Sequence, residues 1–232
     1  NMAYMIPEVP EILAKKGALF VVADGLGGHT KGEVASEMAV RKISDTYYAE
    51  QSEEIERSLQ QAIKQANALI YTANQEQGNK EHQEMGTTCV VAVLQGDTVY
   101  VANVGDSRAY IVRSGQVKQV SVDHSIVAEE LRAGIITKDQ VHDHPKLHYI
   151  TRCLGIKPDV EVDVFHELVQ EGDLLVLCTD GLSELISDEE LGQIVQQFGP
   201  QESTQRLIER ANEQGGPDNI TAMVVQVSPA QS

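Results

Sequence analysis

Residues 18–25 read ALFVVADG, a short apolar run that ends at Asp24 and a glycine. A continuous apolar run of this length is typical of a strand that is buried on both faces. Leu26, Gly27 and Gly28 follow, and closely spaced glycines permit the backbone angles of a tight loop. We therefore expect a buried strand that holds the carboxylate of Asp24 at its end.

Two other parts of the chain repeat this design. Residues 173–181 read DLLVLCTDG and place Asp180 after an apolar run, and residues 215–219 read GGPDN and place Asp218 just before another. A carboxylate fixed at a strand end beside a glycine turn suits a hard cation such as Mg²⁺ or Mn²⁺, which prefers oxygen ligands. The alternative is that each Asp only caps its own turn, which is the commonest role of Asp-Gly and Asp-Asn pairs.

The spacing of apolar residues predicts helices and strands in separate blocks. Helical spacing covers residues 32–48, 52–76, 125–133, 188–197 and 201–214. Short Val-rich runs separated by glycine turns predict an antiparallel meander at residues 88–94, 98–104, 108–113 and 116–120. Further strands are predicted at residues 160–165, 174–179 and 220–227, and irregular backbone at residues 6–17. This block order favours an α+β fold over alternating βαβ units.

Length and charge limit the function classes. The 232 residues suit one large domain or two small ones, and no apolar run approaches the roughly 20 residues that span a bilayer. With 18 Lys+Arg against 35 Asp+Glu the net charge is −17, which disfavours nucleic acid as a partner and is compatible with acidic clusters for divalent cations. The three cysteines, Cys89, Cys153 and Cys178, lie among apolar neighbours and are typical of reduced thiols in a cytosolic protein.

Other catalytic motifs do not fit. Residues 25–33 read GLGGHTKGE, which lacks the order of a phosphate-binding loop, and no G-x-S-x-G elbow or cysteine-phosphatase loop is present in the sequence. His142, His144 and His148 lie in a polar stretch, where we expect them to face solvent rather than to bind a transition metal.

Seven segments in order resemble the motif series of the metal-dependent Ser/Thr protein phosphatases (the PPM or type 2C family) in its bacterial form. They read LFVVADGLGGHTKGEVAS, MGTTCVVAVL, VYVANVGDSRAYIVRSGQ, VDHS, ITRCLG, GDLLVLCTDGLSE and GGPDNITAMVV, from about residue 18 to residue 227. The resemblance implies one phosphatase domain over residues 1–232. Its fold would be an αββα sandwich of two antiparallel sheets flanked by helix pairs, with a flap at residues 134–149.

The resemblance also implies a site of two or three Mn²⁺ or Mg²⁺ ions. Asp24 would bridge two ions, Asp180 and Asp218 would bind the first, and the Gly25 carbonyl would bind the second. Asp123 would share a third, weaker ion with Asp180. The resemblance also implies that Glu184 and Asn219 lie behind these ligands, whereas Asp106 is expected to be a structural turn residue. Leu26 stands where some members carry a His, and His29 close by is given no catalytic role.

The activity implied is hydrolysis of phosphoserine and phosphothreonine in one in-line step by a metal-bridged hydroxide. No side-chain nucleophile would be needed. The substrates would be phosphorylated proteins, with a Ser/Thr kinase as the opposing partner, and the protein would be a cytoplasmic, monomeric signalling enzyme that binds no nucleic acid and no membrane.

The sequence departs from the family pattern at its start. The family's first strand carries an Arg that binds phosphate, followed by an Asn-Glu/Gln-Asp motif with an acidic metal ligand. Both should precede Asn1, and neither is in the sequence. We expect this segment to have been lost from the sequence. Two other hypotheses remain, a non-catalytic phosphatase-like binding module and a two-metal nuclease or other phosphoesterase, of which the charge disfavours the nuclease.

Overall fold

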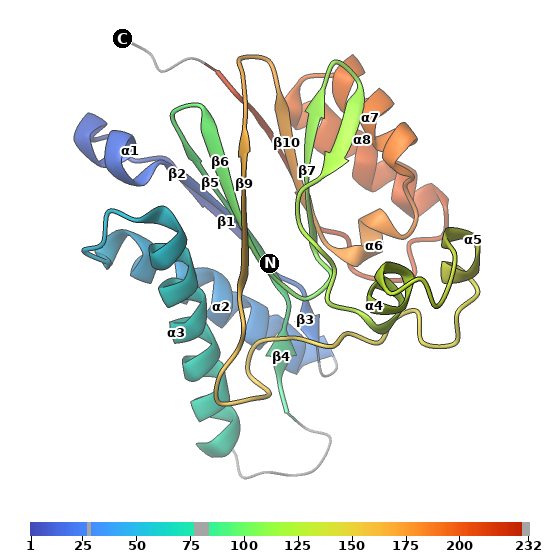
Figure 1. Ribbon diagram of the computed structural model, residues 1–232, viewed down its shortest axis with the longest axis horizontal. Coiled ribbons are helices and arrows are strands. Elements are labelled where there is room, and N and C mark those ends of the chain that lie inside the picture. The colour runs from blue at the N-terminus through green and yellow to red at the C-terminus, as the bar shows by residue number, and fades with distance from the viewer. Residues whose placement is uncertain (27–28, 77–83, 229–232) are drawn as a thin grey trace.

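Two antiparallel sheets stack between two sets of helices (Figure 1). This computed structural model describes residues 1–26, 29–76 and 84–228. The first sheet has the order β1 (Met2–Met5), β2 (Ala18–Val22), β5 (Cys89–Gln95), β6 (Thr98–Val104) and β9 (Asp163–Leu168). The second sheet has the order β11 (Ala222–Gln226), β10 (Leu174–Cys178), β7 (Arg108–Arg113) and β8 (Gln116–Gln119). A short pair, β3 (Gly25–Leu26) and β4 (Gly86–Thr87), lies at one end.

The helices cover the outer faces of the two sheets. The long helices α2 (His29–Ala49) and α3 (Ile55–Glu76) pack on the first sheet, and α7 (Asp188–Gln197) and α8 (Pro200–Glu213) pack on the second (Figure 1). The remaining helices are short: α1 (Pro10–Lys16), α4 (Ile126–Arg132), α5 (Lys138–Val141) and α6 (Asp180–Ser183). This arrangement confirms the αββα sandwich. No helix among the described residues has the length and apolar character to cross a bilayer.

The alternation of side chains along β2 explains its unbroken apolar sequence. Leu19 and Val21 belong to the core between the first sheet and helices α2 and α3, whereas Phe20 and Val22 belong to the core between the two sheets. The same alternation holds in β10 of the second sheet, where Leu177 faces the inter-sheet core and Val176 faces the helices. Strands buried on both faces need apolar residues at every position, and the two sheets bury their inner faces against one another.

Several predictions of local structure were wrong. The four Val-rich runs do not form one meander, because β5 and β6 pair in the first sheet and β7 and β8 pair in the second. The stretch 6–17 is not irregular throughout, since Pro10 begins α1 at a position where proline's missing N–H costs nothing. Strand β9 begins at Asp163 rather than at residue 160, although Val160 and Val162 are buried against the helix layer.

Candidate metal centre

Asp24 lies two residues after the end of β2, where the start of the neighbouring strand fixes its backbone. Its carbonyl oxygen accepts hydrogen bonds from the Thr88 N–H at 2.8 Å and from Thr87 Oγ1 at 2.6 Å, and its N–H donates to Thr88 Oγ1 at 3.2 Å. Three hydrogen bonds thus fix the backbone of Asp24, whose side chain is half-buried. The apolar strand thus holds this carboxylate at its end, as predicted.

Pairing of β10 with β11 brings the loops of Asp180 and Asp218 together. The ladder ends at Cys178 opposite Ala222, and beyond it the Thr179 N–H donates to the Thr221 carbonyl at 3.1 Å. The Thr179 hydroxyl accepts from the Thr221 N–H at 3.0 Å and donates to the Asn219 carbonyl at 3.3 Å. Two residues 38 positions apart (218 minus 180) therefore lie on adjoining turns at one end of the second sheet.

Two glycines allow close backbone approach at this end of the molecule. A Cβ on Gly25 would lie 2.1 Å from the Gly32 carbonyl oxygen, and a Cβ on Gly181 would lie 2.5 Å from the Asn219 carbonyl oxygen. Neither distance is possible for a real side chain, so only glycine fits at either position. The Gly25 carbonyl remains a predicted ligand, and Gly27 and Gly28 of the same loop lie outside the described residues.

Like charges crowd around Asp24. The pKa of Asp24 is raised to about 8, chiefly by burial. The neighbouring Asp180 carboxylate adds to the shift through its charge and a hydrogen bond, and the charges of Asp218 and Asp106 add further. Burial together with Asp180 and Asp123 raises the pKa of Asp106 to about 7. Carboxylates from both sheets thus share one small region, and their negative charges make ionisation of Asp24 and Asp106 more costly.

The predicted ligands carry the kind of donor atom that a divalent cation prefers. A cation bound among neighbouring carboxylates offsets their repulsion, and oxygen donors are the ligands that Mg²⁺ and Mn²⁺ prefer. The glycine contacts let backbone approach the same region closely. Among the described residues, no three His, Cys, Asp or Glu side chains are already arranged to enclose an ion. The structure therefore gathers the predicted ligands Asp24, Asp180 and Asp218 without showing their coordination.

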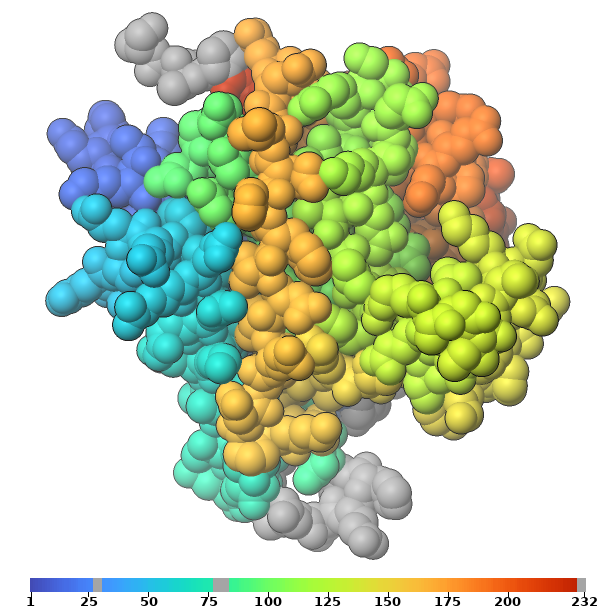
Figure 2. Space-filling view, in the orientation of Figure 1, coloured from blue at the N-terminus to red at the C-terminus, as the bar shows by residue number. Residues whose placement is uncertain are grey.

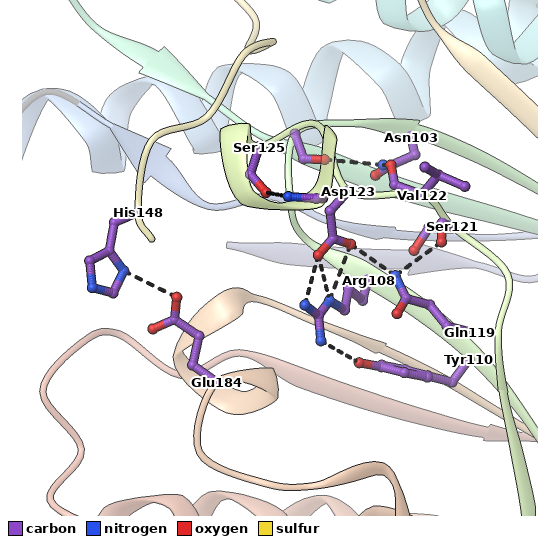
Figure 3. A network of polar contacts seen from close by, with 12 residues as sticks. Asn103, Arg108, Tyr110, Gln119, Ser121, Val122, Asp123, Ser125, His148 and Glu184 are labelled. Carbon is purple, nitrogen blue, oxygen red and sulfur yellow. Dashed lines mark hydrogen bonds and ion pairs between the residues drawn. The ribbon is translucent and has the colours of Figure 1, made fainter. Parts of the chain in front are cut away.

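Asp123 is engaged elsewhere (Figure 3). Its buried carboxylate accepts from Arg108 Nη2 at 2.7 Å and Arg108 Nε at 2.9 Å, and from Gln119 Nε2 at 2.8 Å. Arg108 also donates from Nη1 to the Tyr110 hydroxyl at 3.2 Å. A two-pronged guanidinium pair of this kind is strong and directional. Asp123 is predicted to bind a third ion together with Asp180. To do so, its carboxylate would have to contact Arg108 and the ion at the same time.

A contact between Glu184 and His148 joins the centre to residues 134–149, the predicted flap. Glu184 Oε1 lies 3.1 Å from His148 Nδ1 (Figure 3). Burial and the charge of Asp180 raise the pKa of Glu184, and His148 opposes that shift. Glu184 is therefore close enough to Asp180 to be affected by its charge, and its place behind the ligands stays a prediction.

The flap histidines differ from one another. His148 is largely exposed, as expected, yet it contacts Glu184. His144 does not simply face solvent, because it is mostly buried and its Nε2 lies 3.2 Å from Glu130 Oε2. His142 is exposed at the end of α5. The structure brings none of the three together as a metal site within the part of the chain that it describes. The side chain of His29 lies outside the described residues.

Sequence reasoning treated Asp106 as a turn residue only, and its place among the carboxylates was missed. Gly105 has φ 107° and turns the chain from β6 in the first sheet to β7 in the second. The His124 Nδ1 accepts from the Gly105 N–H at 3.1 Å and fixes this turn. The turn places Asp106 where the charges of Asp180 and Asp123 affect it. The signal was present, since Asp106 also follows an apolar strand and a glycine.

Known proteins resemble this chain along most of its length. Residues 12–224 match the family described as Protein phosphatase 2C. A relative named Serine/threonine phosphatase stp, from Listeria monocytogenes, is 39% identical over 213 residues, covering 90% of this chain and 84% of the relative. The solved structure of Serine/threonine phosphatase Stp1 from Staphylococcus aureus is 32% identical with a TM-score of 0.87, covering 98% of this chain and 88% of that one. A structure of the catalytic domain of the phosphatase PstP in complex with two manganese ions is 34% identical with a TM-score of 0.80, covering 91% and 89%.

Proposed function

Because the chain belongs to the protein phosphatase 2C family, we propose that its carboxylate centre serves the hydrolysis of phosphoserine and phosphothreonine in proteins. The observation that carries this proposal is the meeting of Asp24 from the first sheet with Asp180 and Asp218 from the second. A non-catalytic binding module would have no chemical need to place two carboxylates beside Asp24, where their charges make Asp24 harder to ionise.

The residues have distinct proposed roles toward metal ions. Asp24, Asp180 and Asp218, with the Gly25 carbonyl, would hold two Mn²⁺ or Mg²⁺ ions, and Asp123 with Asp180 would hold a third. Bound ions of this kind supply Lewis acidity, which activates water and offsets the charge of a phosphoryl group. The presence of two manganese ions in the PstP complex supports manganese as a cofactor.

Side-chain nucleophiles have little support from the described residues. The Cys89 and Cys178 thiols are fully buried, and burial raises the pKa of each to about 12. A thiol that stays protonated and out of reach of substrate cannot attack phosphorus. These surroundings favour attack by water over a covalent phosphoenzyme on cysteine.

The start of the sequence lies at the centre. The Asn1 amino group donates to the Ala23 carbonyl at 2.8 Å, and the Ala23 N–H donates to the Asn1 carbonyl at 2.9 Å. The first residue is thus held by two hydrogen bonds to the residue that precedes Asp24.

The proposed substrates are phosphorylated proteins, and a Ser/Thr kinase is the class of enzyme that would supply them. The relatives named as Ser/Thr phosphatases support this substrate class. A monomeric protein acting in the cytoplasm, as the sequence suggested, is part of the same proposal.

The test is hydrolysis of a phosphothreonine peptide in Mn²⁺ and then in EDTA, by this chain and by one extended upstream of Asn1. We expect Mn²⁺-dependent turnover that Asp24→Ala lowers by more than about 100-fold, because losing a metal ligand costs more than losing its supporting partners. Asp45→Ala, an exposed change on α2, is the matched control. Circular dichroism must show that both variants fold.

Calorimetric titration with Mn²⁺ separates the ion sites. We expect Asp123→Ala to bind one ion fewer than the unchanged protein, and unchanged stoichiometry would contradict the role given to Asp123. Absence of turnover by both chains, or full turnover by folded Asp24→Ala, would instead favour the binding-module hypothesis.

A further inference from the structure

A pocket of about 550 Å³ lies between the flap and the second sheet, beside the carboxylate centre. Asp106 and Asp180 of the centre line it, and helices α4 and α5 contribute much of the rest of its lining. Figure 2 shows the flap as a lobe next to the surface of β7 and β8. The volume is typical of pockets that bind small molecules or a few side chains. Nothing so far assigned to the protein uses the flap side of this pocket.

Helices α4 and α5, with the segment after α5, give the pocket an apolar wall. Val127 and Leu131 project from α4, and Val141 and Leu147 come from α5 and the segment after it. Such a wall accommodates the methylene groups of a bound side chain. It does not by itself select among side chains.

Two cations distinguish the flap side. Arg132 and Lys138 both line the pocket, and neither forms an ion pair with a carboxylate in the described ranges of the chain. Arg132 Nη1 donates a hydrogen bond of 3.1 Å to the backbone carbonyl of Asp123. The carboxylate of Asp123 accepts from Arg108 instead. Both side chains are exposed, so Arg132 and Lys138 are open to an incoming carboxylate.

The charges of the pocket are therefore divided. Asp106, Asp180 and Glu184 make the centre side negative until metal ions bind, whereas Arg132 and Lys138 make the flap side positive. When the phosphorylated residue of a peptide lies at the centre, the side chains next to it in the peptide would lie in the pocket. An acidic side chain there would meet Arg132 of α4 and Lys138 of the flap, and complementary charge of this kind favours one sequence over another.

We propose that this pocket binds an acidic side chain, Asp or Glu, that lies within a few residues of the phosphorylated Ser or Thr in the substrate. The proposal rests on the phosphatase function given above and adds a sequence preference to it. Lys138 and Arg132 are its specificity-determining residues, with Lys138 the simpler to test because Arg132 also bonds to backbone.

The test compares phosphothreonine peptides that differ at one position. Glu or Gln is placed in turn at each of the four positions before and after phosphothreonine, and kcat/KM is measured in Mn²⁺. At one position or more we expect Glu to be favoured over Gln by about fivefold, which corresponds to about 1 kcal/mol. Higher salt should reduce the preference, because the cations are accessible to solvent.

Variants assign the preference to the pocket. Lys138→Gln should bring the Glu-to-Gln ratio of kcat/KM close to 1, Lys138→Arg should keep it, and Lys138→Glu should favour Gln. Lys146→Gln is the matched control, since Lys146 is an exposed flap lysine that is not among the residues lining this pocket. It should leave the ratio as in the unchanged protein.

Hydrolysis of a small aryl phosphate separates failure of this proposal from failure of the function. Equal kcat/KM for every Glu and Gln pair, with normal hydrolysis of the aryl phosphate, would overturn the acidic subsite and leave the phosphatase intact. A preference that survives in both Lys138→Gln and Arg132→Gln would also overturn it. If the unchanged protein does not hydrolyse the aryl phosphate, the phosphatase function itself is contradicted.

Discussion

Replacing Asp24 by Asn should stabilise the metal-free protein. The pKa of Asp24 is about 8 in the folded chain, against an ordinary value of 3.8, because burial and the carboxylates of Asp180, Asp218 and Asp106 disfavour its ionised form. Asn has the same shape and can donate a hydrogen bond to Asp180, but it carries no charge. The substitution therefore removes the electrostatic cost and keeps the packing.

The direction of the pH dependence follows from proton binding. Below pH 3.8 Asp24 is protonated in both the folded and the unfolded chain, so it does not lower the free energy of unfolding. Between pH 3.8 and 8 the unfolded chain releases the proton and the folded chain keeps it, so the free energy of unfolding falls as pH rises. Each pKa unit is worth about 1.4 kcal/mol, which gives a cost of about 4 kcal/mol at pH 7. Relaxation of the exposed Asp218 loop reduces this, and we expect about 2–4 kcal/mol.

Urea unfolding in EDTA at pH 4, 5.5, 7 and 8 measures the effect. The Asp24→Asn variant should gain stability over the unchanged protein as pH rises, whereas Asp45→Asn, which is exposed on α2, should stay within about 0.5 kcal/mol. Adding Mn²⁺ should stabilise the unchanged protein more than the variant, since ligand that binds only the folded state adds to its stability. A difference between the two proteins that does not change with pH would refute the reasoning.

Three further changes test other parts of the structure. Gly181→Ala places a Cβ 2.5 Å from the Asn219 carbonyl and should cost more than about 2 kcal/mol in thermal unfolding; a neutral effect would mean that the turn can shift. Cys153→Ser should retain turnover, because burial raises the pKa of this thiol to about 11; loss of turnover in folded protein would revive a thiol mechanism. Asp173→Asn should lower the free energy of unfolding near neutral pH and make that free energy fall less steeply as the pH is lowered. Its pKa is held down by hydrogen bonds from Arg113, so its stabilisation is present near neutral pH and is lost as pH falls through the acid range. Unfolding measured from pH 2 to 7 would show whether that acid-dependent part disappears.

Much of the fold followed from apolar patterning. Strands buried on both faces, such as β2 and β10, appear as unbroken apolar runs, and their ends correctly located Asp24 and Asp180. The apolar pattern did not indicate which strands pair with one another. The turn between β6 and β7 looks like any other glycine turn, but it crosses from one sheet to the other, which splits the predicted meander.

The same limitation explains the residues that were missed or misjudged. Asp106 becomes part of the acidic cluster only because its turn crosses between sheets. The pairing of Asp123 with Arg108 depends on side-chain direction across β7 and the segment after β8. Spacing along the chain indicates which residues stand at strand ends, whereas contacts between turns depend on tertiary packing.

The distribution of the centre over two sheets has a consequence for folding kinetics. Asp24 and Asp218 are 194 positions apart (218 minus 24), so their meeting requires both sheets to have formed and stacked. Contacts between such distant residues form slowly and late. Cations that bind at this junction would therefore act after the main barrier to folding, and they should slow unfolding far more than they speed folding.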